Sequence, residues 1–211
     1  MNPLRDLPGL QLGSAVAVPR APNFRPPVWP PPSEFPVVIN AHGEVVSRYG
    51  DVSWDLSPWV GPACSINFED GADASVKISS FNASIFRQVT AWWLYGPDAV
   101  LSARTLRINH VNLKPLFVVC SEAGIAATDL WRFPRVIEQV AARLSPSGAN
   151  RALSQLNKLW LARESLGFTL LDDAGLKSLA SLLPDQDDSE QSAYIPPRIW
   201  TYQVLRLREC L

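Results

Sequence analysis

The sequence reads Ser102-Ala-Arg-Thr-Leu-Arg-Ile-Asn-His-Val-Asn-Leu-Lys-Pro-Leu-Phe-Val-Val-Cys-Ser-Glu-Ala-Gly124 near the middle of the chain, and this stretch sets the fold class. At about 100° per residue, Leu106, Leu113 and Phe117 fall on one arc of a helix. Ser102 can cap the first turn, and Gly124 can end the last one. The pattern predicts a helix from Ser102 to Glu122, which Pro115 should kink or split because proline has no backbone N–H.

Segments on both sides of this stretch have the same helical spacing of apolar residues. A glycine or a proline follows most of them, which is typical of helix ends. Pro134 is suited to the first turn of a helix, and Asp172 or Asp173 can begin another. The predicted helices are 84–95, 134–144, 147–165, 172–183 and a last one from Pro197 to Leu211.

The chain before these helices has a different character. Ten of the 19 prolines lie in residues 1–36, so this arm is expected to be extended. It could be a tether or strap, or a proline-rich ligand for the aromatic groove of another protein. From Val37 to about Asp73, short runs of β-branched and aromatic residues lie between glycines, which predicts two or three short strands. Trp54 and Trp59 should cover the apolar face of this small sheet.

The fold class expected is therefore mainly α, a helical bundle with a small β-containing region and an extended proline-rich arm. The predicted boundaries are 1–36 for the arm, 37–82 for the strand-containing region and 83–211 for the helical domain. Because the helical pattern still continues at Leu211, we interpret the chain as the amino-terminal piece of a longer protein. A natural carboxy terminus that docks as a helix is the alternative.

The composition favours a globular protein, since 47% of the residues are hydrophobic and 18% are charged. Three scattered cysteines argue against a disulfide framework, and no signal peptide or membrane-spanning stretch is apparent. We expect a soluble cytoplasmic protein with no membrane partner. The net charge of −1 hides an uneven distribution, because residues 101–170 carry nine basic and four acidic side chains.

These basic side chains fall opposite the apolar arcs of three successive helices. Hydroxyl and amide side chains lie beside them, and this set of groups is typical of contacts to phosphate oxygens. A solvated basic face without a ligand is the competing interpretation. The predicted DNA-binding residues are Arg104, Arg107, Lys114, Arg135, Arg143, Arg151 and Lys158.

The run from Arg104 to Ile125 resembles the first helix of the core-binding domain of tyrosine recombinases, the phage-integrase superfamily. Residues 88–96, 150–160 and 195–202 are similar to flanking segments in that family, so the resemblance covers about residues 80–211. It implies a helical domain that clamps duplex DNA, with other recombinase protomers as further partners. In this family a separate carboxy-terminal domain cleaves the strand, and it carries an arginine, a lysine, a His-x-x-Arg pair and a nucleophilic tyrosine.

The sequence departs from that catalytic pattern. His42 and His110 are followed three residues later by Val45 and Leu113, so neither forms His-x-x-Arg. Without positioned cations a tyrosine cannot transfer a phosphoryl group, and we expect no catalytic residues in this chain. Cys120 lies on the apolar arc and is expected in the core. His110 lies at the edge of that arc, where a boundary position is expected.

We expect neither a metal nor a small-molecule cofactor, because two histidines and three scattered cysteines make no plausible zinc site. Trp92 and Trp93 could stack on bases in a single-stranded nucleic acid, but their helical spacing favours core packing. The predicted function is the DNA-binding, non-catalytic portion of an integrase-like recombinase. The alternative is a non-enzymatic protein-interaction module that uses the proline-rich arm and aromatic surface.

Overall fold

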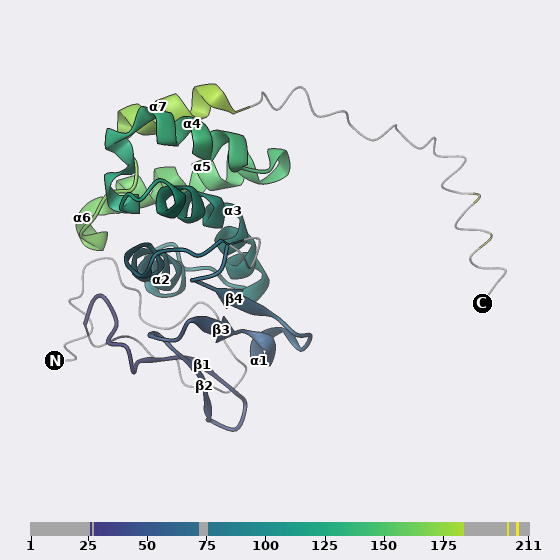
Figure 1. Ribbon diagram of the computed structural model, residues 1–211. Coiled ribbons are helices and arrows are strands. Elements are labelled where there is room, and N and C mark those ends of the chain that lie inside the picture. Colours follow the sequence, from purple (N-terminus) through teal and green to yellow (C-terminus); the bar gives the residue numbers. More distant parts are fainter. Residues whose placement is uncertain (1–25, 27, 72–75, 184–201, 203–205, 207–211) are drawn as a thin grey trace.

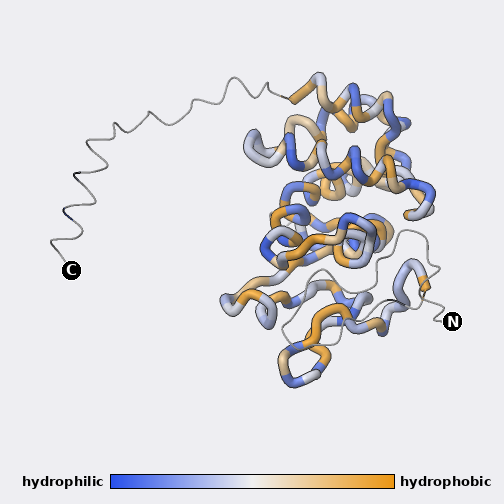
Figure 2. Tube along the Cα trace, turned by 180° about the vertical axis from the view of Figure 1, so that it is seen from behind, coloured by the Kyte–Doolittle hydropathy of each residue, from blue (hydrophilic) through white to orange (hydrophobic). Residues whose placement is uncertain are grey.

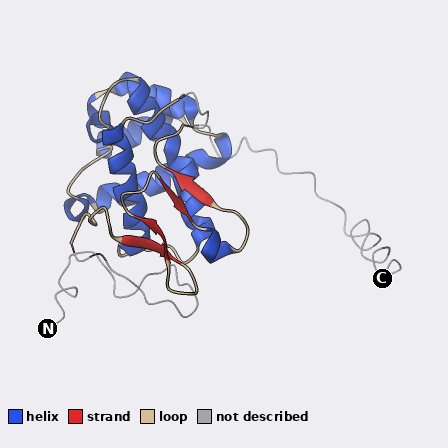
Figure 3. Ribbon diagram, turned by 60° about the horizontal axis from the view of Figure 1, so that its bottom comes forward, coloured by secondary structure: helices blue, strands red, loops and turns tan. Residues whose placement is uncertain are grey.

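The computed structural model describes residues 26, 28–71, 76–183, 202 and 206. Two small sheets lie on one side of a larger helical part (Figures 1 and 3), which confirms the mainly α class. The amino-terminal elements are β1 (Pro36–Ile39), β2 (Val45–Arg48), β3 (Ser53–Asp55), α1 (Ser57–Val60) and β4 (Ser65–Asn67). The helices that follow are α2 (Ser80–Tyr95), α3 (Ala103–Glu122), the 3-10 helix η2 (Ala127–Arg132), α4 (Pro134–Arg143), α5 (Pro146–Leu161), α6 (Arg163–Leu166) and α7 (Asp173–Leu182).

The four strands form two antiparallel pairs. β1 pairs with β2 through a tight turn, in which the Asn40 side chain accepts hydrogen bonds from the backbone N–H groups of His42 and Glu44. β3 pairs with β4, with Trp54 opposite Ile66. The sequence predicted two or three strands, from the runs at residues 37–39, 44–49 and 64–68. These runs correspond to β1, β2 and β4, and β3 lies in none of them.

Helix α3 is the central element, because it contacts α2, α4 and α5. Its first turn is capped by Ser102, whose hydroxyl accepts from the backbone N–H groups of Arg104 and Thr105, as predicted. The helix is continuous through Pro115, so the predicted split is wrong. Pro115 is partly exposed, and its missing hydrogen bond concerns the carbonyl of Val111, a residue on the outer face that water can reach.

Other predicted helix bounds need correction. Helix α2 begins at Ser80, one turn before the predicted start at residue 84, because the Ser79 hydroxyl caps the helix by accepting from the backbone N–H of Asn82. The predicted helix from Ser147 to Ser165 is two helices, α5 and α6, which Ala162 separates. Asp172 caps α7 by accepting from the N–H of Gly175, as expected.

One hydrophobic core joins the strands to the helices. Aromatic rings form a continuous series: Trp54 packs on Phe68, Phe68 on Phe86 of α2, and Phe86 on Phe117 of α3, with ring centroids 4.8, 5.7 and 4.3 Å apart. The buried cluster extends from Phe35 to Leu179, and hydrophobic stretches occur in the strand region as well as in the helices (Figure 2). Trp54 is fully buried, and Trp59 packs against the same cluster.

Several predictions concern residues outside the described ranges. Most of the proline-rich arm lies there, although Trp29 and Phe35 at its end belong to the described part and pack on Trp92 and Tyr95. The expected helix from Pro197 to Leu211 also lies outside, except for Tyr202 and Arg206, which are helical.

Candidate nucleic-acid interface and adjoining pocket

Helix α3 presents the first group of predicted basic residues on its outer face. Arg104 and Arg107 are exposed, Lys114 is half-buried, and Val111 beside them is exposed. The buried leucines and Phe117 occupy the opposite arc, so the predicted division of this helix is confirmed. Burial lowers the pKa of Lys114, and the carboxylate of Asp70 nearby opposes that effect.

Helix α5 supplies the second group, Arg151 and Lys158, both of which are exposed. It packs closely against α3 at Gly148, since a Cβ atom there would lie only 2.5 Å from the side-chain oxygen of Asn112. The close contact brings the two helices side by side. Neither α5 nor α3 before Glu122 contains an aspartate or glutamate.

Ion pairs divide the basic residues into two sets. Within the described part of the chain, the basic residues that pair with carboxylates are Arg48, Lys77, Arg87, Arg132, Arg143, Arg163 and Lys177. Within residues 28–71 and 76–183, the basic residues for which no ion pair forms with a described residue are Arg104, Arg107, Lys114, Arg135, Arg151 and Lys158, and all six belong to the predicted DNA-binding set. Their charge is therefore available to an external anion.

The two basic residues of α4 differ from the other five. The guanidinium of Arg143 lies 3.0 Å from the carboxylate of Glu122, which neutralises it. Arg135 is exposed near the start of α4, and no described contact joins it to the basic residues of α3 or α5. We group Arg104, Arg107, Lys114, Arg151 and Lys158 under the name α3–α5 basic face, because their two helices are in contact and none of the five forms an ion pair with a described residue. Of the five, Arg151 and Lys158 line the pocket described next, whereas the three on α3 do not.

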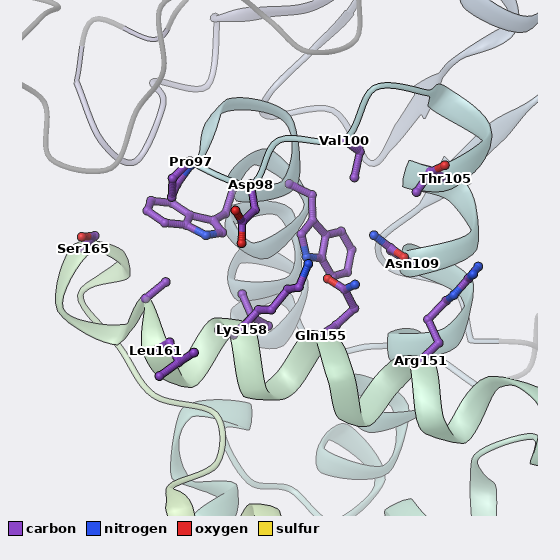
Figure 4. A pocket seen from close by; sticks show the side chains of 14 residues that line it. Pro97, Asp98, Val100, Thr105, Asn109, Arg151, Gln155, Lys158, Leu161 and Ser165 are labelled. Atoms are coloured by element: carbon purple, nitrogen blue, oxygen red, sulfur yellow. The ribbon is translucent and has the colours of Figure 1, made fainter. Parts of the chain in front are cut away.

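A pocket of about 470 Å³ opens where α2, α3 and α5 meet (Figure 4). The indoles of Trp92 and Trp93 and the side chain of Leu159 contribute its buried apolar lining. Arg151, Gln155 and Lys158 reach it from α5, while Thr105 and Asn109 line it from α3. Asp98, in the loop after α2, lies at its exposed rim.

Asn109 is the unusual residue of this pocket. The residue is only 3% exposed, and no hydrogen bond joins its side-chain amide to a residue that the structure describes, but the amide atoms themselves are open to solvent in the pocket. Sequence reasoning missed Asn109, Gln155 and Asp98. The sequence did offer one signal for Asn109. This residue lies on the same side of α3 as Thr105, and a polar residue is unusual where one helix packs on another. Trp92 and Trp93 are buried as predicted, but both also line the pocket.

His110 is buried, so the predicted boundary position is wrong. Its ring stacks on Phe86 with centroids 4.2 Å apart, and its Nε2–H donates to the backbone oxygen of Asn67 at 3.1 Å. Burial, with a contribution from Lys114, lowers the pKa of His110 to about 3, which keeps the ring neutral. The contact to Asn67 in β4 covers this side of α3, which spacing within one helix could not reveal.

Cys120 is fully buried, as predicted, and burial raises its pKa to about 12, so this side chain is a thiol and not a thiolate near neutral pH. Within the described ranges, His, Cys, Asp and Glu residues form no group of three or more that could hold a metal ion. No helix in those ranges has the length and apolar character needed to cross a membrane.

Comparison of the chain with protein-family models, with curated proteins and with solved structures finds no match. The function proposed below therefore depends on the α3–α5 basic face and the pocket.

Proposed function

We propose that this protein binds duplex DNA through the α3–α5 basic face and has no catalytic activity of its own. The observation that supports the proposal is that none of the five basic residues of this face forms an ion pair with a described residue. Most basic side chains elsewhere in the described chain do pair with carboxylates, and among the five only Lys114 has a carboxylate nearby, that of Asp70.

The length and chemistry of the face suit a phosphate backbone. The cations of α3 extend from Arg104 to Lys114, roughly 15 Å along the helix axis, so they can reach more than one phosphate of a strand. Hydroxyl and amide groups beside the cations, such as Thr105 and Ser154, add neutral hydrogen-bond donors. If all five cations contact phosphates, the logarithm of the binding constant should fall with the logarithm of the salt concentration with a slope of about −4 to −5.

The test is fluorescence anisotropy with a labelled duplex at several salt concentrations. We expect wild-type binding at low salt and the slope given above. The double variant Arg104→Glu, Arg107→Glu should weaken binding by about 30-fold or more, because each reversal removes one phosphate contact and adds a repulsive charge. The matched control is Arg132→Glu, Lys177→Glu, which reverses two ion-paired cations outside the face and should change affinity by less than about threefold.

The absence of wild-type binding at low salt, or equal losses in the two double variants, would exclude this proposal.

We propose a narrower role as well, that of the DNA-clamping, non-catalytic portion of a tyrosine recombinase, acting in the cytoplasm. It is supported by the resemblance of residues 80–211 to core-binding domains and by the lack of His-x-x-Arg in the sequence. A reading frame that continues past Leu211 into a His-x-x-Arg pair and a tyrosine would bear this out, whereas a natural stop codon after Leu211 would count against it.

A further inference from the structure

The amide of Asn109 indicates a ligand that is not part of the protein. No hydrogen bond joins this amide to a described residue, and its atoms are open to the pocket, so water can satisfy them in the free protein and a polar ligand can take the place of that water. The other buried asparagine, Asn82, is fully satisfied by bonds to Ser121, Ile125 and Ala127. Asn109 instead faces the pocket, where a bound molecule could supply the missing donor and acceptor (Figure 4).

The chemistry of the pocket changes from its floor to its mouth. The floor is aromatic and offers a ligand only the small open part of each side chain, since Trp92, Trp93 and Asn109 are 6%, 4% and 3% exposed. The mouth is charged, because the exposed side chains of Arg151 and Lys158, two turns apart on α5, extend toward it. Gln155 lies between these two cations on the same helix (Figure 4).

The ligand should therefore combine a flat ring with an anionic group. Indole rings bind flat heteroaromatic rings by stacking or edge contacts, and the amides of Asn109 and Gln155 each offer a donor beside an acceptor, which matches the edge of a nucleobase. Arg151 and Lys158 match a phosphate. Asp98 at the rim can accept hydrogen bonds from ribose hydroxyls. A volume of about 470 Å³ is within the usual range for small-molecule sites.

We propose that this pocket binds one nucleoside monophosphate unit, with the base on the indole floor against Asn109 and the phosphate between Arg151 and Lys158. The unit could be a free nucleotide or an unpaired nucleotide of a nucleic acid, since the two present the same groups. The proposal shares Arg151 and Lys158 with the proposed DNA-binding function, but Arg104 and Arg107 do not line the pocket. The two ideas can therefore fail separately.

The test uses adenosine 5′-monophosphate as the probe, measured by calorimetry and by quenching of tryptophan fluorescence. Ribose 5-phosphate and adenosine are the comparison ligands, because each lacks one half of the probe. We expect the complete nucleotide to bind about tenfold or more tightly than either half. Equal binding of ribose 5-phosphate would overturn the assignment of the floor to the base.

The decisive variant is Asn109→Leu, which keeps the size of the side chain and removes its polar atoms. We expect nucleotide affinity to fall by about tenfold or more, while the melting temperature changes little, because the amide makes no hydrogen bond to a described residue that the variant would lose. Gln155→Leu, on the partly exposed side of α5, is a second variant that should weaken binding without affecting folding. Unchanged nucleotide binding in both variants would refute the proposal.

Two further experiments identify the source of the nucleotide and distinguish the nucleotide site from the proposed duplex-binding function. A duplex with one unpaired adenosine that binds more tightly than the intact duplex, and loses this advantage in Asn109→Leu, would identify a nucleic acid as the source. Binding of the free nucleotide alone would identify a small-molecule site. Arg104→Glu, Arg107→Glu should lose duplex affinity and keep nucleotide affinity. If neither the free nucleotide nor the unpaired adenosine shows Asn109-dependent binding, the pocket is not a nucleotide site.

Discussion

Replacement of His110 by phenylalanine should remove a large part of the acid sensitivity of this fold. The folded protein holds the pKa of His110 at about 3, mainly because the ring is buried and also because Lys114 is near, whereas the ordinary value is 6.5. In the unfolded chain the imidazole is free to take up a proton below pH 6.5. Acid therefore favours unfolding, and the stabilisation present above pH 6.5 is lost as the pH falls toward 3.

The size of the effect follows from the two pKa values. Each unit of pH between them costs about 1.4 kcal/mol, so this one group should reduce the free energy of unfolding by about 2 kcal/mol between about pH 8 and about pH 5. His110→Phe keeps an aromatic ring against Phe86 and removes the titrating group. The variant loses the hydrogen bond to Asn67, so its stability at high pH should be lower than that of the wild type.

The assay is urea denaturation at about pH 8 and about pH 5. The quantity compared between variants is the change in the free energy of unfolding between these two pH values. We expect the wild type to lose about 2 kcal/mol more than His110→Phe over this interval. His42→Gln is the control, since His42 is exposed in the β1–β2 turn and should behave as the wild type does. The same loss in the wild type and in His110→Phe would refute the reasoning that the buried imidazole is the acid-sensitive group.

Two further predictions test other parts of the core. Asn82→Leu should lower the free energy of unfolding by about 3 kcal/mol or more, because it leaves the backbone groups of Ile125 and Ala127 unpaired. Thermal denaturation of Asn82→Leu and of Asn109→Leu checks this, since Asn109→Leu should show no such loss. Iodoacetamide at about pH 8 should label Cys120 only after denaturation, because burial raises its pKa to about 12; peptide mapping by mass spectrometry measures the labelling, and rapid modification of the native protein would contradict it.

The features that were predictable from the sequence depend on neighbouring residues. Ser102 and Asp172 cap helices through bonds to backbone groups two or three positions away, and the apolar arc of α3 follows from helical periodicity. The basic residues of α3 and α5 could be assigned to outer faces for the same reason. Strand β3 was missed because its three residues become a strand only by pairing with β4, about ten positions later.

The features that the sequence did not reveal depend on distant parts of the chain. Asn109 and His110 are adjacent in sequence and both are buried, but α5 approaches the first and the backbone of Asn67 contacts the second. Helical spacing placed His110 at a boundary because it takes no account of what packs there. Likewise, the charge of Arg143 is neutralised by Glu122, 21 positions earlier, and no local pattern predicts that ion pair.

The series of rings from Trp54 through Phe68 to Phe86 has a practical consequence for dissecting this protein. A shortened chain that begins near residue 83 would keep the basic helices but uncover the apolar side of α2, and such a surface promotes aggregation. Loss of DNA or nucleotide binding after such a deletion would report on solubility rather than on ligand contacts. Point substitutions at exposed positions in the 211-residue chain are therefore the sounder way to map its surfaces.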